Sequence, residues 1–177
     1  MKGADTSSEA TMLFDAWLGE FARNAETRDA NRAARLLVAD GHWKDLLALT
    51  WEHKIFSGRA DIAAAFDSTF DILEPRDFRR SVDRAAPLAR RRSGRDVLEG
   101  YFDFETRVGK CTAFARLVQT EDGSAAWILL TTLQQLHDCG RADRSDGHGG
   151  ATWLERREAE RAFAERDPEV IVIGAGH

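Results

Sequence analysis

The stretch from Val97 to His137 reads VLEGYFDFETRVGKCTAFARLVQTEDGSAAWILLTTLQQLH, and it decides the fold. Apolar residues alternate along 97–108, which predicts a strand. Gly109-Lys110 predicts a two-residue type II′ turn, after which strands follow over 111–119 and 126–136. This antiparallel meander is apolar on both faces, so both faces need cover. We expect helices on one face, and a dimer partner or further protein on the other.

The N-terminal half predicts three helices that supply this cover. The first carries Leu13, Trp17 and Phe21 at four-residue spacing, which gives it one apolar stripe. A shorter helix is predicted over 30–38. The third opens at Ser57-Gly58 and runs to about Leu73, where Pro75 follows.

Two more strand regions lie between these helices. From His42 to Phe56 the odd positions give a long period-two pattern, which predicts two strands or one strand broken by a turn or bulge. The residues at those odd positions are Trp43, Asp45, Leu47, Leu49, Trp51, His53 and Ile55. The segment Phe78–Asp83 alternates in the manner of an edge strand.

Composition favours a soluble globular protein. Of the 177 residues, 43% are hydrophobic and 31% are charged, and the net charge is −5, which argues against a nucleic-acid partner. The basic cluster at 90–95 is interpreted as a solvated strand end or loop. The sequence shows no signal peptide and no apolar run of membrane-spanning length. Cys111 and Cys139 form no framework, so we expect a cytoplasmic protein.

The last third of the chain predicts a different module. The segment 138–150 is polar and glycine-rich like a linker, and a charged helix is predicted over Trp153–Arg166. In Asp167–His177, Pro168 precedes the apolar strand Val170–Ile173 and Gly174-Ala175-Gly176, the first two glycines of a dinucleotide-binding turn. We expect the start of a Rossmann domain that is cut off at His177; the alternative is a glycine-rich tail.

The order of these elements resembles the SnoaL-like, or nuclear transport factor 2-like, cone. The resemblance rests on Phe56-Ser57-Gly58-Arg59 opening a helix and on the strands at 101–106 and 126–133. It implies an α+β fold in which three helices from the N-terminal half pack on a curled antiparallel sheet, plus a C-terminal linker helix. The expected domains are a cone (1–137), a linker with a charged helix (138–166) and a truncated Rossmann strand and turn (167–177).

A closer resemblance is to bacterial flavin-containing monooxygenases that carry such a cone ahead of their FAD module. It rests on Trp153-Leu154-Glu155-Arg156-Arg157, on Asp167-Pro168 and on the following strand and glycine turn. It implies an accessory ligand-binding or assembly domain of an FAD- and NADPH-dependent oxidoreductase. Gly174 and Gly176 would bind cofactor only in the full-length parent, and no cofactor is expected in this chain. A homodimer, or docking on a downstream FAD domain, is implied, with no membrane partner.

Related cones also include isomerases, dehydratases and cyclases that use carboxylates as acids and bases. The candidate residues here are Asp45 and His53, which share an alternating face with Trp43 and Trp51, together with Tyr101 and Asp103 from the meander. A free-standing enzyme with this pocket and a binder of a small apolar ligand therefore stay open as alternatives. A structural role for the same residues also stays open, with Asp45 accepting backbone hydrogen bonds.

No metal site is expected. His137, Cys139, Asp146 and His148 have the right side chains, but their spacing matches no zinc pattern.

Overall fold

The computed structural model describes residues 3–138 and residues 154, 157, 158 and 161. The chain divides into two compact units, Met1–Arg141 and Ala142–His177, and all the elements named below lie in the first. Most of the predicted linker helix and all of 167–177, including Gly174 and Gly176, lie outside the described residues. The helices are α1 (Gly3–Glu26), α2 (Ala30–Arg35) and α3 (Arg59–Leu73). The strands are β1 (Leu37–Leu46), β2 (His53–Ser57), β3 (Arg76–Arg80), β4 (Leu88–Arg92), β5 (Arg95–Glu105), β6 (Gly109–Thr120) and β7 (Gly123–Leu136).

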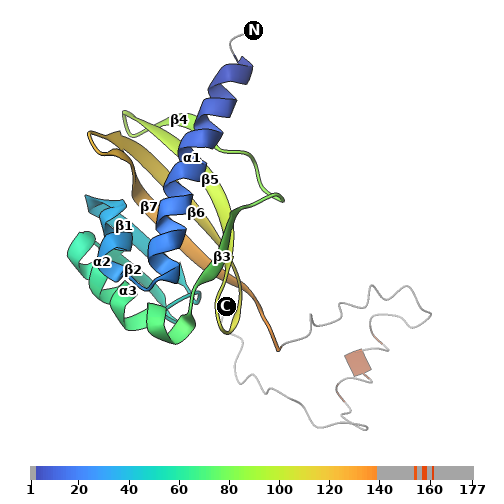
Figure 1. Cartoon of the computed structure of the whole chain (residues 1–177). Helices are drawn as coiled ribbons and strands as arrows, with labels where there is room; N and C mark the ends of the chain where they lie inside the picture. The colour runs from blue at the N-terminus through green and yellow to red at the C-terminus, as the bar shows by residue number, and fades with distance from the viewer. Residues whose placement is uncertain (1–2, 139–153, 155–156, 159–160, 162–177) are drawn as a thin grey trace. The chain divides into compact units, whose positions relative to one another are not determined.

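The strands form one seven-stranded sheet in the order β2-β1-β7-β6-β5-β3, with β4 paired to β5. The α+β class with three helices on a curled sheet is therefore confirmed (Figure 1). The sheet is mixed rather than wholly antiparallel, because β1 and β7 pair in parallel. Parallel neighbours need a long crossover, and here the whole chain between β1 and β7 supplies it.

The meander β5-β6-β7 is confirmed, but its first turn differs from the prediction. Gly109 belongs to β6, and Glu105 pairs with Lys110, so the loop is longer than two residues. Thr106 closes it by donating its backbone N–H to the Gly109 carbonyl (2.9 Å) and accepting the Gly109 N–H on its hydroxyl (3.2 Å). The glycine is needed for close packing, since a Cβ there would lie 2.3 Å from the Gln135 carbonyl oxygen.

The second helix is shorter than the sequence pattern predicts. It ends at Arg35, and Leu37 and Val38 belong to β1 instead. The backbone of Leu36 already bonds across the sheet, because its carbonyl accepts the Ala126 N–H at 2.8 Å. Pairing with β7 therefore overrides local helix preference at this point.

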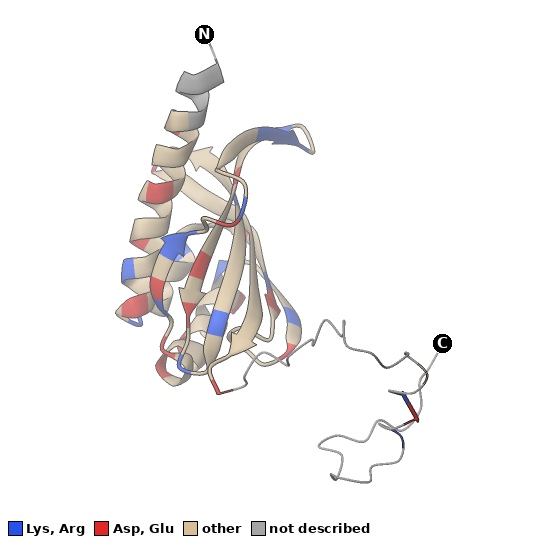
Figure 2. Ribbon diagram, turned by 90° about the vertical axis from the view of Figure 1, so that its right-hand side faces the viewer, with Lys and Arg blue, Asp and Glu red and all other residues tan. Residues whose placement is uncertain are grey.

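One face of the sheet, which we call the inner face, is covered by the helices. Helix α1 lies along the sheet in both views, and α3 lies beside β1 and β2 (Figures 1 and 2). Along α1, Phe14, Trp17 and Phe21 are buried, while Leu13 of the predicted stripe is only partly buried. Gly100 of β5 makes room for the first of these rings, since a Cβ at that position would lie 2.5 Å from Phe14. Other large, fully buried side chains are Trp43, Phe66, Phe70, Phe102 and Phe104.

The basic cluster lies on the exposed strand β4 and at the start of β5, as interpreted from the sequence. Figure 2 shows its arginines as a blue segment at the top of the sheet. Arg91 pairs with Asp96, and Arg92 pairs with Glu99. Among the described residues, no helix is long and apolar enough to cross a membrane.

Candidate functional site

Asp45 is fully buried on the inner face and has four hydrogen-bond donors around its carboxylate. The hydroxyl of Thr131 donates to Oδ1 at 2.5 Å. Oδ2 accepts the backbone N–H groups of Leu49 (3.0 Å) and Thr50 (2.7 Å) and the Thr50 hydroxyl (2.8 Å). Trp43 completes the network by donating its indole N–H to the Thr131 hydroxyl at 2.9 Å. Asp45 thus fixes the loop between β1 and β2.

His53 lies on the opposite face of the sheet from Asp45. In the β1–β2 pair, Asp45 faces Lys54, while His53 faces Leu46, and directly opposed residues share a face. His53 is exposed, and so is Trp51 in the loop before it. The prediction that these residues share one face with Asp45 and Trp43 is therefore wrong, because the connecting loop reverses the alternation between the strands.

Tyr101 and Asp103 also lie on the face away from the helices, which we call the outer face. The Tyr101 ring packs against Phe114 (centroids 5.1 Å apart), and the Arg84 guanidinium lies 5.7 Å from its centre. Asp103 accepts a hydrogen bond from the Thr112 hydroxyl at 2.9 Å. Both side chains are partly buried.

The structure does not bring the four candidate residues into one pocket. Asp45 points inward and the other three point outward. His53 and Asp103 share a cross-strand row on the outer face, but four strand spacings separate them, or roughly 19 Å. Their catalytic role stays a prediction, and a shared acid–base step between them has no support from this geometry.

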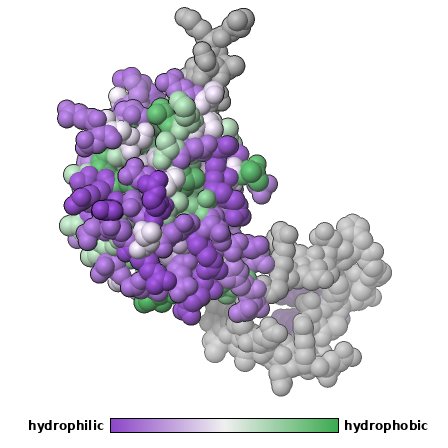
Figure 3. Space-filling model, viewed as in Figure 1, coloured by the Kyte–Doolittle hydropathy of each residue, from purple (hydrophilic) through white to green (hydrophobic). Residues whose placement is uncertain are grey.

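The inner face around Asp45 is filled by aromatic side chains. Trp43 stacks on Phe56 at 4.8 Å and lies 4.7 Å from Phe66, which in turn stacks on Phe70 at 4.7 Å. The pattern indicates a packed core at this point rather than a substrate chamber. Seen from the side of α1, the molecular surface is mostly hydrophilic with scattered apolar residues (Figure 3).

The histidine and cysteine cluster considered from sequence is only partly described. His137 bonds to the Thr106 carbonyl oxygen through Nε2 at 3.0 Å and lies 3.9 Å from Glu105. Cys139, Asp146 and His148 lie outside the described residues. Within the described residues, no group of three or more His, Cys, Asp or Glu side chains is placed to hold a metal.

A charge network on the outer face was not predicted from sequence. Glu99 accepts two hydrogen bonds from Arg92 (2.9 and 3.0 Å) and one from Arg116 (2.8 Å). The Arg92 hydrogen bond, aided by Arg116 and opposed by burial, lowers the pKa of Glu99 below its usual value. Arg116 and Arg95 also lie over the ring of Trp127, at 6.0 and 5.0 Å. Strand pairing creates this network, so the sequence offered no local signal for it.

The outer face carries partly buried apolar side chains along its middle. One cross-strand row runs Tyr101, Phe114, Leu130, Lys44 and Ile55 from β5 to β2. The neighbouring row contains Arg116 and Ile128. No described helix covers this face, and its apolar centre with charged margins is typical of a protein–protein interface.

The margin of the outer face at β5 carries charges of both signs. Asp103 and Glu105 of β5 lie opposite Arg79 and Arg76 of β3, and Glu105 also lies opposite Lys110 of β6. At the other margin, β1 contributes Lys44.

The sequence matches no protein-family model and no curated protein. Solved structures with the same fold are found instead. A nuclear transport factor 2-like protein with a cystatin-like fold from Novosphingobium aromaticivorans has a TM-score of 0.51 and 16% identity, covering 84% of this chain and 88% of its own. A domain with a cystatin-like fold from Nostoc punctiforme has a TM-score of 0.53 and 14% identity, covering 92% and 97%.

A putative aromatic ring hydroxylase from Novosphingobium aromaticivorans is similar at a TM-score of 0.54 and 15% identity, covering 72% of this chain and 92% of its own. These likenesses establish the nuclear transport factor 2-like, cystatin-like fold.

Proposed function

We propose that the chain is an assembly domain with a nuclear transport factor 2-like fold, which pairs with a second copy through the outer face of its sheet. The observation that carries the proposal is the division between the two faces. Around Asp45 the inner face is filled by aromatic rings and by a carboxylate with four donors, while the outer face presents a row of apolar side chains without a described cover.

The outer face has the features that association requires. Phe114, Leu130 and Tyr101 supply apolar area at its centre, where removal from water contributes most. Sheet faces of this kind pack face to face about 10 Å apart in two-layer architectures.

In this proposal the domain belongs to a longer FAD- and NADPH-dependent monooxygenase of the cytoplasm. The supports are the resemblance of 153–157 and 167–176 to the leader segment of flavin-containing monooxygenases and the similar fold of a putative aromatic ring hydroxylase. The two cysteines of the sequence, Cys111 and Cys139, form no disulfide framework by their spacing, which fits that compartment. Docking of the outer face on the downstream FAD module is the variant of this proposal in which the partner is not a second copy.

The proposal places no flavin among the described residues. Trp43, Phe66 and Phe102 fill the inner face, which would otherwise cradle an apolar ring system. FAD and NADPH would therefore bind in the downstream module, with Gly174 and Gly176 in its first phosphate-binding turn.

Two measurements test the proposal separately. Sedimentation velocity of this chain tests assembly: the mass of two copies supports it, and a monomer at all concentrations overturns it. A flavin absorbance spectrum of the protein extended through the downstream reading frame tests the parent enzyme. A yellow extended protein supports it, and an in-frame stop after His177 or a colourless, folded extension contradicts it.

A further inference from the structure

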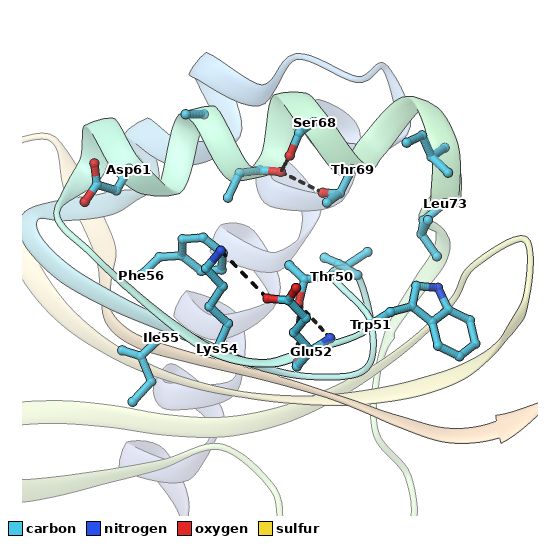
Figure 4. Close-up of a pocket in the computed structure, with 14 residues that line it drawn as sticks. Thr50, Trp51, Glu52, Lys54, Ile55, Phe56, Asp61, Ser68, Thr69 and Leu73 are labelled. Carbon is cyan, nitrogen blue, oxygen red and sulfur yellow. Dashed lines mark hydrogen bonds and ion pairs between the residues drawn. The ribbon is translucent and has the colours of Figure 1, made fainter.

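A groove of about 690 Å³ runs between helix α3 and strand β2 (Figure 4). None of the four candidate acid–base residues lines it, and Ile55 is the one residue that it shares with the row described on the outer face. Apolar residues of α3, of β2 and of the loop before β2 make up much of its lining: Leu49, Trp51, Ile55, Phe56, Ile72 and Leu73.

Strand β2 is an edge of the sheet with unpaired backbone groups. Within the described residues it pairs only with β1. The bonds from Gly58 N–H to Gly41 O and from Leu47 N–H to Glu52 O bracket that pair and set which residues face β1. Alternate residues of an antiparallel strand bond to the partner through their backbones, so the backbone N–H and C=O groups of Lys54 and Phe56 point to β1. The N–H and C=O groups of His53, Ile55 and Ser57 consequently point to the free edge.

The walls of the groove leave space beside that edge. Figure 4 shows Phe56 and Lys54 pointing toward α3, whereas Ile55 points away from it. The face of α3 that lines the groove contains the small residues Ala64 and Ala65. Ser68 also lines it, and its hydroxyl is turned back to the Ala65 carbonyl at 2.8 Å. An added chain can therefore lie between strand and helix.

One end of the groove carries an exposed tryptophan on a fixed loop. Trp51 is 48% exposed and has a positive φ of 58°, which is rare for a large side chain. Leu47, at the other end of the same loop, has a φ of 66°. Asp45 holds this loop through the Leu49 and Thr50 N–H groups, so Trp51 is positioned before any partner arrives.

The other end of the groove carries a carboxylate. Asp61 lies at the start of α3, on the side away from Trp51 (Figure 4). Its side chain makes no ion pair in the part of the chain that the structure describes. Glu52 and Lys54, which also line the groove, are 3.8 Å apart and offset each other, so the groove keeps a net negative charge.

We propose that this groove binds an extended peptide, which adds to the free edge of β2 as a further strand. Backbone hydrogen bonds to His53, Ile55 and Ser57 would hold it, and its alternate apolar side chains would enter the groove under α3. A Lys or Arg at its end nearest Ser57 would meet Asp61. The 13 residues from Asp61 to Leu73 span roughly 20 Å, which corresponds to about six residues of extended peptide.

A synthetic peptide tests this directly. The probe is the acetylated hexapeptide Lys-Thr-Val-Thr-Val-Thr, whose lysine and two valines share one face when it lies antiparallel to β2. Titrated into the isotope-labelled full chain, it is expected to shift the amide resonances of Ile55 and Ser57 and to slow hydrogen exchange at Ile55. No shift at millimolar peptide, or shifts confined to the outer face, overturns the proposal.

Two variants separate strand addition from loose apolar contact. Ile55→Pro removes an outward N–H that makes no bond to β1, so binding is expected to be lost, while Ile55→Val retains it. Binding by Ile55→Pro equal to that of the unaltered chain contradicts strand addition.

Asp61→Lys is expected to weaken the lysine peptide about fivefold and to strengthen a peptide with glutamate in place of lysine. Asp67→Lys, on α3 but outside the groove lining, is the matched control and should change neither affinity. Equal effects of the two variants on peptide affinity would show that Asp61 does not contact the peptide. A chain that sediments as a monomer is expected to bind the peptide equally well, so failure of the assembly proposal and failure of this one are distinguishable.

Discussion

Asp45 and Thr131 are neighbours on β1 and β7, although they are 86 positions apart in the sequence. They oppose each other in the parallel β1–β7 pair, both are buried, and the Thr131 hydroxyl donates to the Asp45 carboxylate at 2.5 Å. The same hydroxyl accepts the Trp43 indole N–H. This pair connects the centre of the sheet to the loop that presents Trp51. Both oxygens of the buried Asp45 carboxylate accept hydrogen bonds from the fold itself, Oδ1 from Thr131 and Oδ2 from the loop.

Replacing Asp45 with Asn is expected to lower the free energy of unfolding by about 3 kcal/mol. An amide puts an NH₂ group where the carboxylate accepts donors, so at least one buried N–H or O–H loses its acceptor. Urea unfolding measures the change. Asp40→Asn, at an exposed position of the same strand, is the control and should alter stability little. An unchanged midpoint for Asp45→Asn would contradict the structural role.

Gly100→Ala is expected to destabilise the chain by about 2 kcal/mol. The added methyl group would lie 2.5 Å from the Phe14 ring, and that ring is itself buried. Gly19→Ala offers a matched comparison, because no atom lies within 4 Å of its added Cβ and alanine favours helix, so it should stabilise by up to about 1 kcal/mol. Thermal unfolding of both variants decides the question, and equal melting temperatures would refute the packing of α1 on β5.

Cys111 is expected to resist thiol reagents until the chain unfolds. Burial, as the largest cause, raises its pKa from 9.0 to about 12, so the thiolate is scarce at neutral pH. Reaction with a colorimetric disulfide reagent in a Cys139→Ser background isolates this thiol. Fast labelling in buffer without denaturant would show that the inner face is open.

The same shift has a consequence for stability in alkali. The unfolded thiol ionises at lower pH than the folded one, so stability falls as the pH rises through 9 toward 12. The decline should be smaller in Cys111→Ala, which lacks the thiol. Parallel unfolding curves for the two proteins across that range would contradict burial of Cys111.

Glu99 is expected to contribute to stability at neutral pH but not in strong acid. Its pKa is lowered in the folded state, chiefly by Arg92, so its contribution is present above its ordinary pKa and is lost as the pH falls through the folded value. Glu99→Gln should therefore unfold more easily than the parent at pH 7 and similarly at low pH. A difference that is constant with pH would exclude ionisation of Glu99 as its cause.

The fold was largely predictable because its elements have strong local patterns. The four-residue spacing of Leu13, Trp17 and Phe21 predicted α1, and alternation predicted β5, β6 and β7. The pairing of β1 with β7 was not predictable, since it depends on contacts between distant segments. That pairing also explains why α2 ends early. Strand β1 begins at Leu37 and Val38, which the sequence pattern still allowed in the helix.

The candidate site was less predictable, because the loop before β2 decides which residues of β2 point to which face of the sheet. In β1 the odd residues Trp43 and Asp45 point inward, but each pairs with an even residue of β2, namely Phe56 and Lys54. His53 therefore points outward, although its number keeps the alternation of β1. The loop 47–52 has an even number of residues, and this sets the pairing of odd with even positions. Its two residues with positive φ, Leu47 and Trp51, are not glycines that would have marked a turn in the sequence.

The outer face as an assembly surface is tested most directly by sedimentation velocity of Leu130→Arg. Leu130 lies at the centre of the apolar row, and an arginine there would bury an unpaired charge in the interface. The unaltered chain is expected to sediment as two copies and the variant as one, with unchanged circular dichroism. Ser68→Arg on α3, an exposed position away from the outer face, should still sediment as two copies. A dimeric Leu130→Arg, or a monomeric unaltered chain, would contradict assembly through this face.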